Sequence, residues 1–367
     1  MRLLTVFGTR PEAIKMAPLI KAIEQCPEFE SRVCVTGQHR EMLDVALKQF
    51  NIKPDADLGI MSPEQTLTDI TSRTLMGMGE VFEKMEPDMV LVHGDTATTL
   101  AGSLAAFYAK IPVGHVEAGL RTFNRYSPFP EEMNRRIVSD ICTMHFCPTK
   151  LNAENLKEEG IVNDVYVTGN TGIDALSMTV RDDYVFETKY LNRVNFTKKI
   201  ILATIHRREN YSDLESILGS FIDILNEIRD AELILPVHLS PFVREKVRDI
   251  LRDAERVHLT APLPVLDMHN LMARSTLVMT DSGGLQEEAP SLGKPVLVLR
   301  RETERPEAIE AGTVKLSGVE RADIAADAIE LLSNKKAYVK MAKAVNPYGD
   351  GKASERIVNT ILGKMYL

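Results

Sequence analysis

Short apolar runs rich in β-branched residues alternate with longer helical stretches along the whole chain. This alternation is typical of βα units that form mostly parallel sheets, so an α/β fold is predicted. The predicted strands of the first half are 2–7, 31–36, 88–93, 112–116, 143–147 and 165–167. Those of the second half are 199–205, 231–237, 256–259, 276–280, 295–299 and 313–316. Two equal sets of strands indicate two similar halves.

The length of the chain also favours two domains, because 367 residues exceed what a single hydrophobic core usually organises. A turn-forming cluster at 168–172 and a polar stretch at 181–198 place the boundary near residue 170. The predicted domains are therefore 1–170 and 171–351. The last segment, 352–367, has apolar residues at helical spacing, and this pattern alone allows a helix docked on either half.

Charge and cysteine content exclude several classes of function. The 44 basic and 52 acidic residues give a net charge of −8, without the basic surface that a nucleic-acid partner requires. The four cysteines form no C-x-x-C pair, which predicts a reducing compartment and neither a disulfide scaffold nor a zinc ribbon. The N-terminus is apolar for only a few residues, so neither a signal peptide nor a membrane span is expected. We expect a cytoplasmic protein that does not bind membranes.

Three acidic residues of the first half are candidates for a site. Ligands of open α/β sheets bind beyond the carboxyl ends of the strands, and two facing halves would form a cleft there. Asp95 and Glu117 each follow a predicted strand, and Glu131 follows in a later loop. Carboxylates that converge on one site can divide acid and base roles.

Each of these acids also has a structural alternative. Asp95 could be the N-cap of the next helix, and Glu117 could pair with Arg121 or act as a cap. Glu131 could be an acid in the first turn of a helix, where negative charge is favourable.

Strand 2–7 leads into Gly8-Thr9-Arg10-Pro11-Glu12, a glycine turn with a proline suited to the first turn of a helix. Free N–H groups at the start of that helix, together with Arg10 and Lys15, would suit an anionic ligand. The pattern is neither G-x-G-x-x-G nor a P-loop. The alternative is an ordinary turn with exposed cations.

In the second half, His206 and two arginines follow the carboxyl end of strand 199–205. This density of polar residues favours a functional role for His206. His238 follows another strand in the same way, and its role stays open. His258 and His269 have no such polar company in the sequence, so a structural role is predicted for both.

A pair of glycines is the most specific feature of the second half. Ser282-Gly283-Gly284 opens a predicted helix and exposes consecutive backbone N–H groups, which suits a diphosphate. Glu288 on the same helix could accept hydrogen bonds from a ribose diol, and Arg305 lies beyond a later strand. The alternatives are a glycine-lined loop with a solvated acidic helix and, for Arg305, a surface ion pair with Glu304 or Glu307. An anion site in one half and acids in the other suit an enzyme of nucleotide sugars.

Longer blocks of the sequence resemble a known family, in the same order and over residues 3 to about 362. The blocks are F-G-T-R-P-E-A-I-K-M-A-P (7–18), H-G-D-T (93–96), G-H-V-E-A-G-L-R-T (114–122), P-E-E-M-N-R (130–135), H-R-R-E-N (206–210), D-S-G-G-L-Q-E-E-A-P-S-L-G-K-P (281–295), T-E-R-P-E-A (303–308) and N-P-Y-G-D-G (346–351). On these residues the chain resembles the non-hydrolysing UDP-N-acetylglucosamine 2-epimerases of bacteria.

The resemblance implies two Rossmann-like domains in a glycosyltransferase-B-like fold, with the C-terminal helix packed on the first domain, and a homodimer. It implies the interconversion of UDP-N-acetylglucosamine (UDP-GlcNAc) and UDP-N-acetylmannosamine (UDP-ManNAc), which feeds surface polysaccharide synthesis. The implied route is elimination of UDP to a bound 2-acetamidoglucal, followed by re-addition. Neither NAD nor a metal is expected.

The resemblance also implies roles for individual residues. Catalytic roles fall on Asp95, Glu117, Glu131, His206 and Lys15. Substrate binding falls on Arg10, Ser282, Gly283, Gly284, Glu288, Arg305, Met268 and Leu263. Cations and N–H groups would stabilise the departing UDP, and carboxylates would serve the oxocarbenium charge and the C2 proton. Which carboxylate is the base at C2 stays open.

The chain departs from the family's pattern in two places. Met268 stands where the uracil pocket often has an aromatic residue, so the base contact is expected to be softer. Ile205 replaces a smaller residue before His206.

Some relatives bind a second UDP-sugar as an activator near the segment that matches 38–41. Here Glu41 and Glu64 add negative charge, which would disfavour a diphosphate unless Arg40 or Arg207 offsets it. Other functions also stay open, because a fold does not determine a function. They are a hydrolysing epimerase that releases free N-acetylmannosamine, a glycosyltransferase, for which no acceptor site is visible in the sequence, and a sensor that only binds UDP-sugars.

Overall fold

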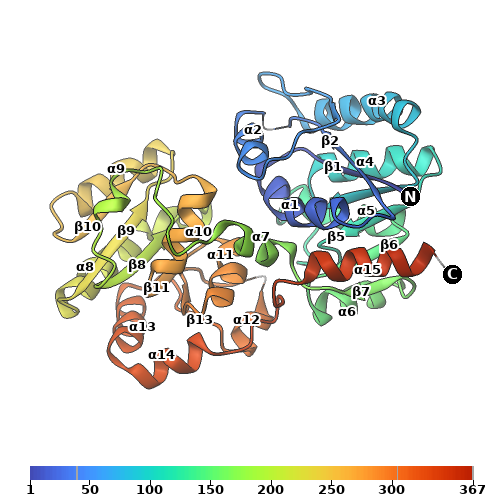
Figure 1. The fold of residues 1–367 in the computed structure, drawn as a ribbon. Helices are drawn as coiled ribbons and strands as arrows, with labels where there is room; N and C mark the ends of the chain where they lie inside the picture. Colours follow the sequence, from blue (N-terminus) through green and yellow to red (C-terminus); the bar gives the residue numbers. More distant parts are fainter. Residues whose placement is uncertain (39, 304, 366–367) are drawn as a thin grey trace. The chain divides into compact units, whose positions relative to one another are not determined.

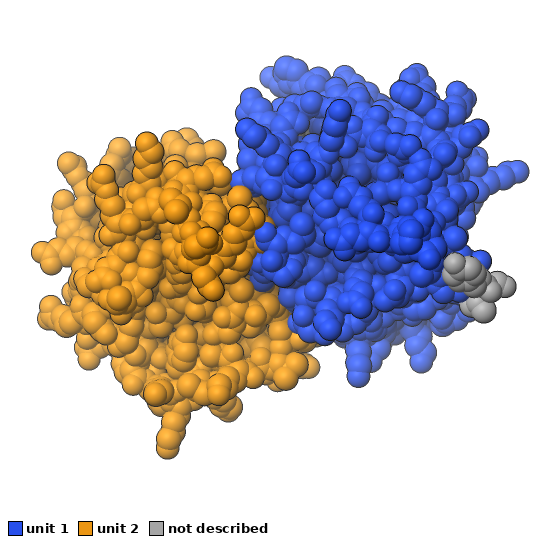
Figure 2. Space-filling view, in the orientation of Figure 1, with its two compact units in different colours: residues 1–178, 348–367 blue, residues 179–347 orange. Residues whose placement is uncertain are grey.

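The computed structural model describes residues 1–38, 40–303 and 305–365. The chain forms two compact units, coloured blue and orange in Figure 2. Unit 1 comprises Met1–Met178 and Tyr348–Leu367, and unit 2 comprises Thr179–Pro347.

The division between the units differs from the boundary near residue 170 that the sequence suggested. Helix α7 (Thr171–Thr179) stays with unit 1 almost to its end. Its Asp174 accepts hydrogen bonds from the first two N–H groups of α15 (Ala353–Met365), at 3.1 and 2.6 Å. These N–H groups would otherwise lack a partner at the start of the helix. Helix α15 also packs on α1 (Arg10–Glu24), as the red and blue helices of Figure 1 show.

Unit 1 is built on a parallel sheet that has seven strands within the described residues, in the order β3-β2-β1-β4-β5-β6-β7. The strands are β1 (Arg2–Phe7), β2 (Glu30–Val35), β3 (Ala56–Asp57), β4 (Met89–His93), β5 (Val113–Val116), β6 (Met144–Cys147) and β7 (Val165–Val167). The remaining helices of the unit are α2 (Arg40–Gln49), α3 (Leu67–Met85), α4 (Ala97–Tyr108), α5 (Glu131–Ile141) and α6 (Lys150–Glu158). Strand β4 is buried along its whole length, as expected for a parallel sheet covered on both faces.

Unit 2 repeats this architecture with a parallel sheet of six strands in the part that the structure describes, in the order β10-β9-β8-β11-β12-β13. The strands are β8 (Lys199–Thr204), β9 (Ala231–Pro236), β10 (Val257–Thr260), β11 (Leu277–Thr280), β12 (Val296–Val298) and β13 (Val314–Leu316). The α-helices are α8 (Leu214–Glu227), α9 (Pro241–Leu251), α10 (Val265–Arg274), α11 (Gly283–Glu288), α12 (Pro306–Glu310), α13 (Arg321–Ser333) and α14 (Lys335–Ala342). Short 3₁₀ helices are η1 (Leu191–Arg193), η2 (Arg208–Asp213) and η3 (Ala289–Leu292).

These two sheets confirm the predicted α/β class, and all twelve predicted strands coincide with observed ones. Strand β3 was not predicted from the sequence, because it has two residues and no apolar run. Each unit has its own hydrophobic core, which includes Phe7 and Leu91 in unit 1 and Phe221 and Met279 in unit 2. None of the helices in the described part of the chain is long and apolar enough to cross a membrane.

Candidate active site

In both sheets the strand order reverses beside the first strand of the unit. Strand β1 lies between β2 and β4, and β8 lies between β9 and β11. The crevice beyond the carboxyl ends of the strands at such a point is the usual ligand site of an open α/β sheet. Arg10 and Asp95 follow β1 and β4, and His206 and Ser282 follow β8 and β11. The fold therefore brings these predicted residues to the switch point of their own unit.

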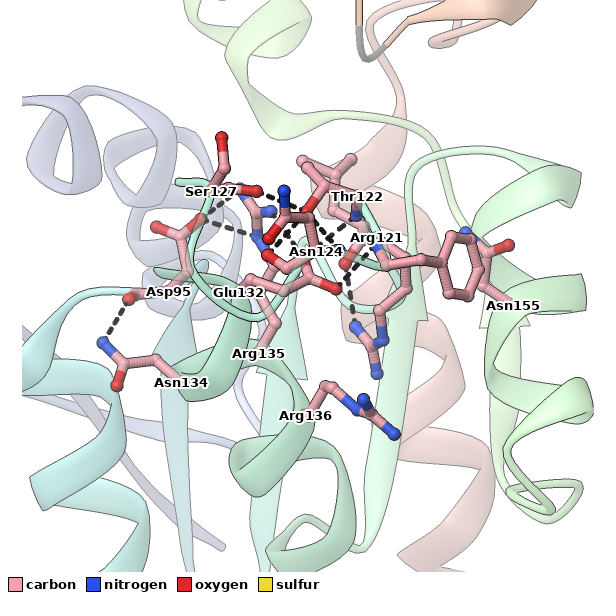
Figure 3. Close-up of polar contacts among 12 residues, drawn as sticks. Asp95, Arg121, Thr122, Asn124, Ser127, Glu132, Asn134, Arg135, Arg136 and Asn155 are labelled. Carbon is pink, nitrogen blue, oxygen red and sulfur yellow. Dashed lines mark hydrogen bonds and ion pairs between the residues drawn. The ribbon is translucent and has the colours of Figure 1, made fainter. Parts of the chain in front are cut away.

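Asp95 lies against Arg135 of α5 (Figure 3). Nε of Arg135 donates to Asp95 Oδ2 at 2.8 Å, and Nη2 lies 2.7 Å from the same oxygen. Nδ2 of Asn134 donates to the backbone oxygen of Asp95 at 2.8 Å. Among the described residues, none donates a hydrogen bond to Asp95 Oδ1. The capping alternative for Asp95 is wrong, because the side chain of Thr96 accepts the N–H of Thr99 at 3.0 Å and caps α4.

Glu117 follows β5 in the left-handed conformation, with φ at 64°. A residue other than glycine is uncommon there, and such backbone strain is often found at functional sites. Its carboxylate forms an ion pair with Lys15, and Nε2 of His93 lies 3.6 Å from Oε2. Arg121 is 2.6 Å from Glu159 instead, so the alternative pairing of Glu117 with Arg121 is wrong.

Glu131 is the first residue of α5, which agrees with the alternative of an acid in the first turn of a helix. That role alone does not explain the surroundings of its carboxylate. Its Oε2 is buried and has no hydrogen-bond partner among the described residues. A buried carboxylate oxygen without a partner costs free energy unless a proton or a ligand satisfies it. The next residue, Glu132, was not singled out from the sequence, yet it is 1% exposed and pairs with Arg135.

Arg10 opens helix α1 and is half-buried. Burial lowers the pKa of Arg10, and no carboxylate of the described residues offsets this effect. A half-buried cation in this situation suits an anionic ligand. Two residues on, the buried carboxylate of Glu12 accepts the N–H groups of Gly8 (3.1 Å) and Thr9 (2.8 Å) and the hydroxyl of Thr96 (2.9 Å). Glu12, another residue that sequence reasoning missed, therefore joins the loop after β1 to the loop after β4.

In unit 2, a buried carboxylate holds the predicted histidine. Nδ1 of His206 lies 2.8 Å from Oδ1 of Asp281, and Oδ2 accepts the N–H groups of His206 and Arg207, both at 2.9 Å. Nδ2 of Asn210 donates to Asp281 at 3.1 Å. Burial alone would raise the pKa of Asp281, but the interactions with His206 and the backbone N–H groups bring that pKa below its usual value. Since Nδ1 faces Asp281, Nε2 of His206 is the ring nitrogen that a ligand can reach.

The glycine loop at 282–284 differs in one respect from the sequence-based prediction. The N–H of Ser282 donates to the hydroxyl of Thr280 at 2.9 Å, so the row of N–H groups predicted for a diphosphate is shorter by one. A Cβ added to Gly283 would lie 2.5 Å from Cζ of Arg305, whereas one added to Gly284 would meet nothing closer than a side-chain oxygen at 3.6 Å. A side chain at 283 would therefore displace the guanidinium of Arg305.

Arg305 is held by a buried acid. Its Nε donates to Oε1 of Glu287 at 2.5 Å, and the side chain of Glu287 is 4% exposed. The surface ion pair that the sequence suggested involved Glu304 or Glu307, and Glu304 lies outside the described residues. A buried anchor fixes the guanidinium more firmly than a surface pair would.

Glu288 is accompanied by a histidine that the sequence assigned to a structural role. Nε2 of His269 lies 3.6 Å from Oε2 of Glu288, and Nδ1 is hydrogen-bonded to the hydroxyl of Thr179 at 2.8 Å. Burial lowers the pKa of His269 to about 4, so the ring is neutral near pH 7. Met268 on the same helix is half-buried, and Leu263 just before it is buried. His269 lies 19 residues before Glu288 in the sequence, so only the fold could reveal its place beside that acid.

The other two histidines of unit 2 have local partners. Nδ1 of His238 accepts the N–H of Ser240 at 3.2 Å. Nε2 of His258 lies 2.9 Å from Oε2 of Glu232, in agreement with a structural role.

The segment that matches the activator site of some relatives is only partly described, since His39 lies outside the described residues. Arg40 forms ion pairs with Asp44, at 3.0 Å, and with Asp57. Its charge is therefore largely neutralised within the unit, which weakens its ability to offset Glu41.

Comparisons with known proteins show the family to which the chain belongs. The family model of UDP-N-acetylglucosamine 2-epimerases matches residues 21–362. The UDP-N-acetylglucosamine 2-epimerase of Bacillus subtilis is 54% identical over 364 residues, which cover 99% of this chain and 95% of that protein. The enzyme of the same name from Escherichia coli K12 is 50% identical over 370 residues, 98% of each chain. The crystal structure of UDP-GlcNAc 2-epimerase from Neisseria meningitidis bound to UDP-GlcNAc superimposes with a TM-score of 0.90 at 49% identity, over 99% of this chain and 100% of that one. The chain therefore belongs to the UDP-N-acetylglucosamine 2-epimerase family, a family of isomerases.

Proposed function

We propose that the chain interconverts UDP-GlcNAc and UDP-ManNAc by inverting C2 of the sugar through elimination and re-addition of UDP. The observation that carries the proposal is the presence of Asp95, Glu117 and Glu131 on strand-end loops and the following helix of unit 1, in a chain of this family. The Neisseria relative is bound to UDP-GlcNAc, which supports the same substrate here.

The chemistry at C2 favours elimination. The C2 proton is not next to a carbonyl group, so its direct removal would leave a carbanion without stabilisation. In the proposed route the C1–O bond to UDP breaks, a carboxylate takes the C2 proton, and a bound 2-acetamidoglucal with a C1=C2 double bond remains. UDP then adds back to C1 while a proton is delivered to the opposite face of C2. The atoms and electrons balance without a further reactant.

Unit 1 supplies the carboxylates for this route. Asp95 and Glu131 each have a carboxylate oxygen without a hydrogen bond from the described residues, which suits contact with a sugar or a proton. Lys15 forms an ion pair with Glu117 and holds its carboxylate in place. Ionised carboxylates stabilise the positive charge that develops on the sugar ring as UDP leaves.

Unit 2 supplies most of the groups for UDP. Nε2 of His206 and the N–H groups of Gly283 and Gly284 would stabilise the negative charge of the departing diphosphate, together with Arg10 of unit 1. The remaining proposed contacts to the nucleotide are Ser282, Glu288, Arg305, Met268 and Leu263.

A product assay tests this proposal. Purified protein is incubated with UDP-GlcNAc alone, and the products are separated and identified by NMR. We expect UDP-ManNAc without added NAD or metal. Free N-acetylmannosamine with UDP would identify a hydrolysing epimerase, and binding without turnover would identify a sensor. A product formed only with an added acceptor would identify a glycosyltransferase.

We propose in addition that the enzyme is a homodimer that uses an apolar face of unit 1. Large apolar side chains are exposed on α4, on α5 and in the loop before α5, and α4 packs on α5. They are Phe107, Tyr108, Phe123, Tyr126, Phe129 and Ile137. A cavity of about 440 Å³ lies at this face, lined in part by Phe123 and Ile137. Large apolar side chains exposed in this number on neighbouring elements favour a protein contact. Light scattering of the purified enzyme tests the dimer.

The biological setting follows from the product and the thiols. UDP-ManNAc is a precursor suited to surface polysaccharides, and we place the enzyme in the cytoplasm because all four cysteines are free, as is typical of a reducing compartment. Activation by a second UDP-GlcNAc would need a diphosphate site near Arg40, whose charge Asp44 and Asp57 already offset. We therefore expect hyperbolic rather than sigmoidal dependence of the rate on UDP-GlcNAc concentration.

A further inference from the structure

Glu132 occupies a place that an acid in the first turn of a helix does not require. It is the second residue of α5, but its carboxylate also binds the loop before the helix, and Figure 3 shows it among the residues of that loop and α5. Oε2 accepts the N–H of Thr122 at 3.0 Å, and Oε1 accepts the N–H of Phe123 at 3.1 Å. Favourable interaction with the helix dipole does not require these contacts with the loop at 122–123. The contacts therefore indicate a second role for this buried side chain.

The same carboxylate also holds Arg135. Nη1 of Arg135 donates to Oε2 of Glu132 at 3.2 Å, while Nε donates to Oδ2 of Asp95 at 2.8 Å. Burial alone would lower the pKa of Arg135, but the charges of Asp95 and Glu132 raise it above its usual value. The guanidinium is therefore a fixed positive charge shared by two carboxylates.

Asp95 alone would neutralise the charge of Arg135. A second carboxylate that is 1% exposed costs desolvation free energy, and charge balance does not require it. What Glu132 adds is orientation. Because it binds Nη1, it turns the edge formed by Nε and Nη2 toward Asp95, and both of those nitrogens contact Oδ2. The other oxygen, Oδ1, then keeps a defined position for a ligand.

Glu132 also links the elements that carry the other two acids. It follows Glu131 directly on α5, and its backbone partners at 122–123 belong to the segment that continues from Glu117. The side chain of Glu132 thus connects the three segments that carry Asp95, Glu117 and Glu131. We propose that Glu132 is a positioning residue that sets the carboxylate of Asp95 through Arg135, an inference that rests on the role proposed above for Asp95.

The test replaces Glu132 by Gln, which keeps the size of the side chain and removes its charge. The amide oxygen can retain the bonds of Oε2, whereas the amide nitrogen must face the N–H of Phe123. We expect Glu132→Gln to lower kcat at least ~10-fold, because small displacements of a reacting group cost rate, and to leave KM for UDP-GlcNAc within about twofold.

Glu159→Gln is the matched control in the same unit. Glu159 pairs with Arg121, whose side chain is 0% exposed, and lies 3.5 Å from Arg136. Within the described residues it makes no direct polar contact with Asp95 or Arg135. Both substitutions remove a carboxylate from a buried arginine, so a purely structural effect should be alike in the two. We expect Glu159→Gln to retain the kcat of the wild type. If Glu132→Gln does not give a native circular dichroism spectrum, Glu132→Asp and Glu159→Asp repeat the comparison.

A double-mutant cycle with Asp95→Asn separates this inference from the proposed function. If Glu132 acts through Asp95, adding Glu132→Gln to Asp95→Asn should lower kcat no further. Wild-type turnover of Asp95→Asn alone would refute the proposed role of Asp95. If Asp95→Asn is impaired but Glu132→Gln turns over like the wild type, or the two losses multiply, the positioning role is refuted while the proposed function stands.

Discussion

Unit 1 should lose stability in mild acid because His115 is buried in its neutral form on β5. Nε2 of His115 donates to the backbone oxygen of Gly94 at 2.7 Å, which fixes the neutral tautomer. Burial is the largest of the effects that lower the pKa of His115 from 6.5 to about 3; the charges of His145, His93 and Arg121 act in the same direction, and the hydrogen bond to Gly94 opposes them.

The magnitude follows from these two pKa values. In the unfolded chain the ring binds a proton near pH 6.5, whereas in the folded chain it binds one only near pH 3. Between these values the unfolded state holds more protons, so the free energy of unfolding falls as the pH falls. Lowering the pH from 7 to 5 should remove roughly 2 kcal/mol through this one group.

The assay compares the wild type with His115→Gln, which removes the titrating ring but keeps an N–H that can reach Gly94. Urea unfolding is followed by circular dichroism at pH 7 and pH 5. Two transitions are expected, because each unit has its own core, and only that of unit 1 should differ between the wild type and the variant. The wild type should lose roughly 2 kcal/mol more than the variant between the two pH values. An equal loss in both proteins would refute the assignment of this pH dependence to His115.

Three further substitutions test the site. Asp95→Asn should lower turnover ~10²–10⁴-fold, because an amide cannot transfer the proton, while the melting temperature stays near that of the wild type. Near-normal turnover would transfer the acid–base role to the other carboxylates. Gly283→Ala should weaken UDP binding in calorimetry by displacing Arg305. Wild-type affinity of this variant would remove Arg305 from the nucleotide site. Thr96→Ala should cost about 1 kcal/mol of unfolding free energy through loss of the α4 cap, and no loss in urea unfolding would contradict that role.

The strands and the class of fold could be predicted because both depend on local patterns. Buried parallel strands such as β4 and β8 are nearly continuous apolar runs between polar segments, so a sequence shows them directly. Strand β3 has two residues, and its pairing depends on where β2 lies in the sheet. The placement of α7 depends on a contact of Asp174 with a helix almost at the other end of the chain. A prediction from local sequence cannot detect that contact, because its partners are far apart in the chain.

The candidate site could be located but not resolved from the sequence. Asp95 and Thr96 are adjacent and both are good N-caps, so only the backbone conformation decides that Thr96 caps the helix. Glu131 and Glu132 are likewise adjacent acids, and their different burial and partners depend on the loop that packs beside them. The partner of Arg121 is a residue far along the chain instead of the nearby Glu117. In each case the residue type indicated a possible role, but the sequence could not show which partner the side chain contacts.

In the proposed route UDP leaves and returns while C2 exchanges its proton. Incubation of the purified enzyme with UDP-GlcNAc in D₂O, with the C2 position of the sugar followed by NMR, measures this exchange. We expect UDP-ManNAc that carries deuterium at C2, formed without added NAD. UDP-ManNAc that keeps the original hydrogen at C2, or that forms only after NAD is supplied, would contradict this route.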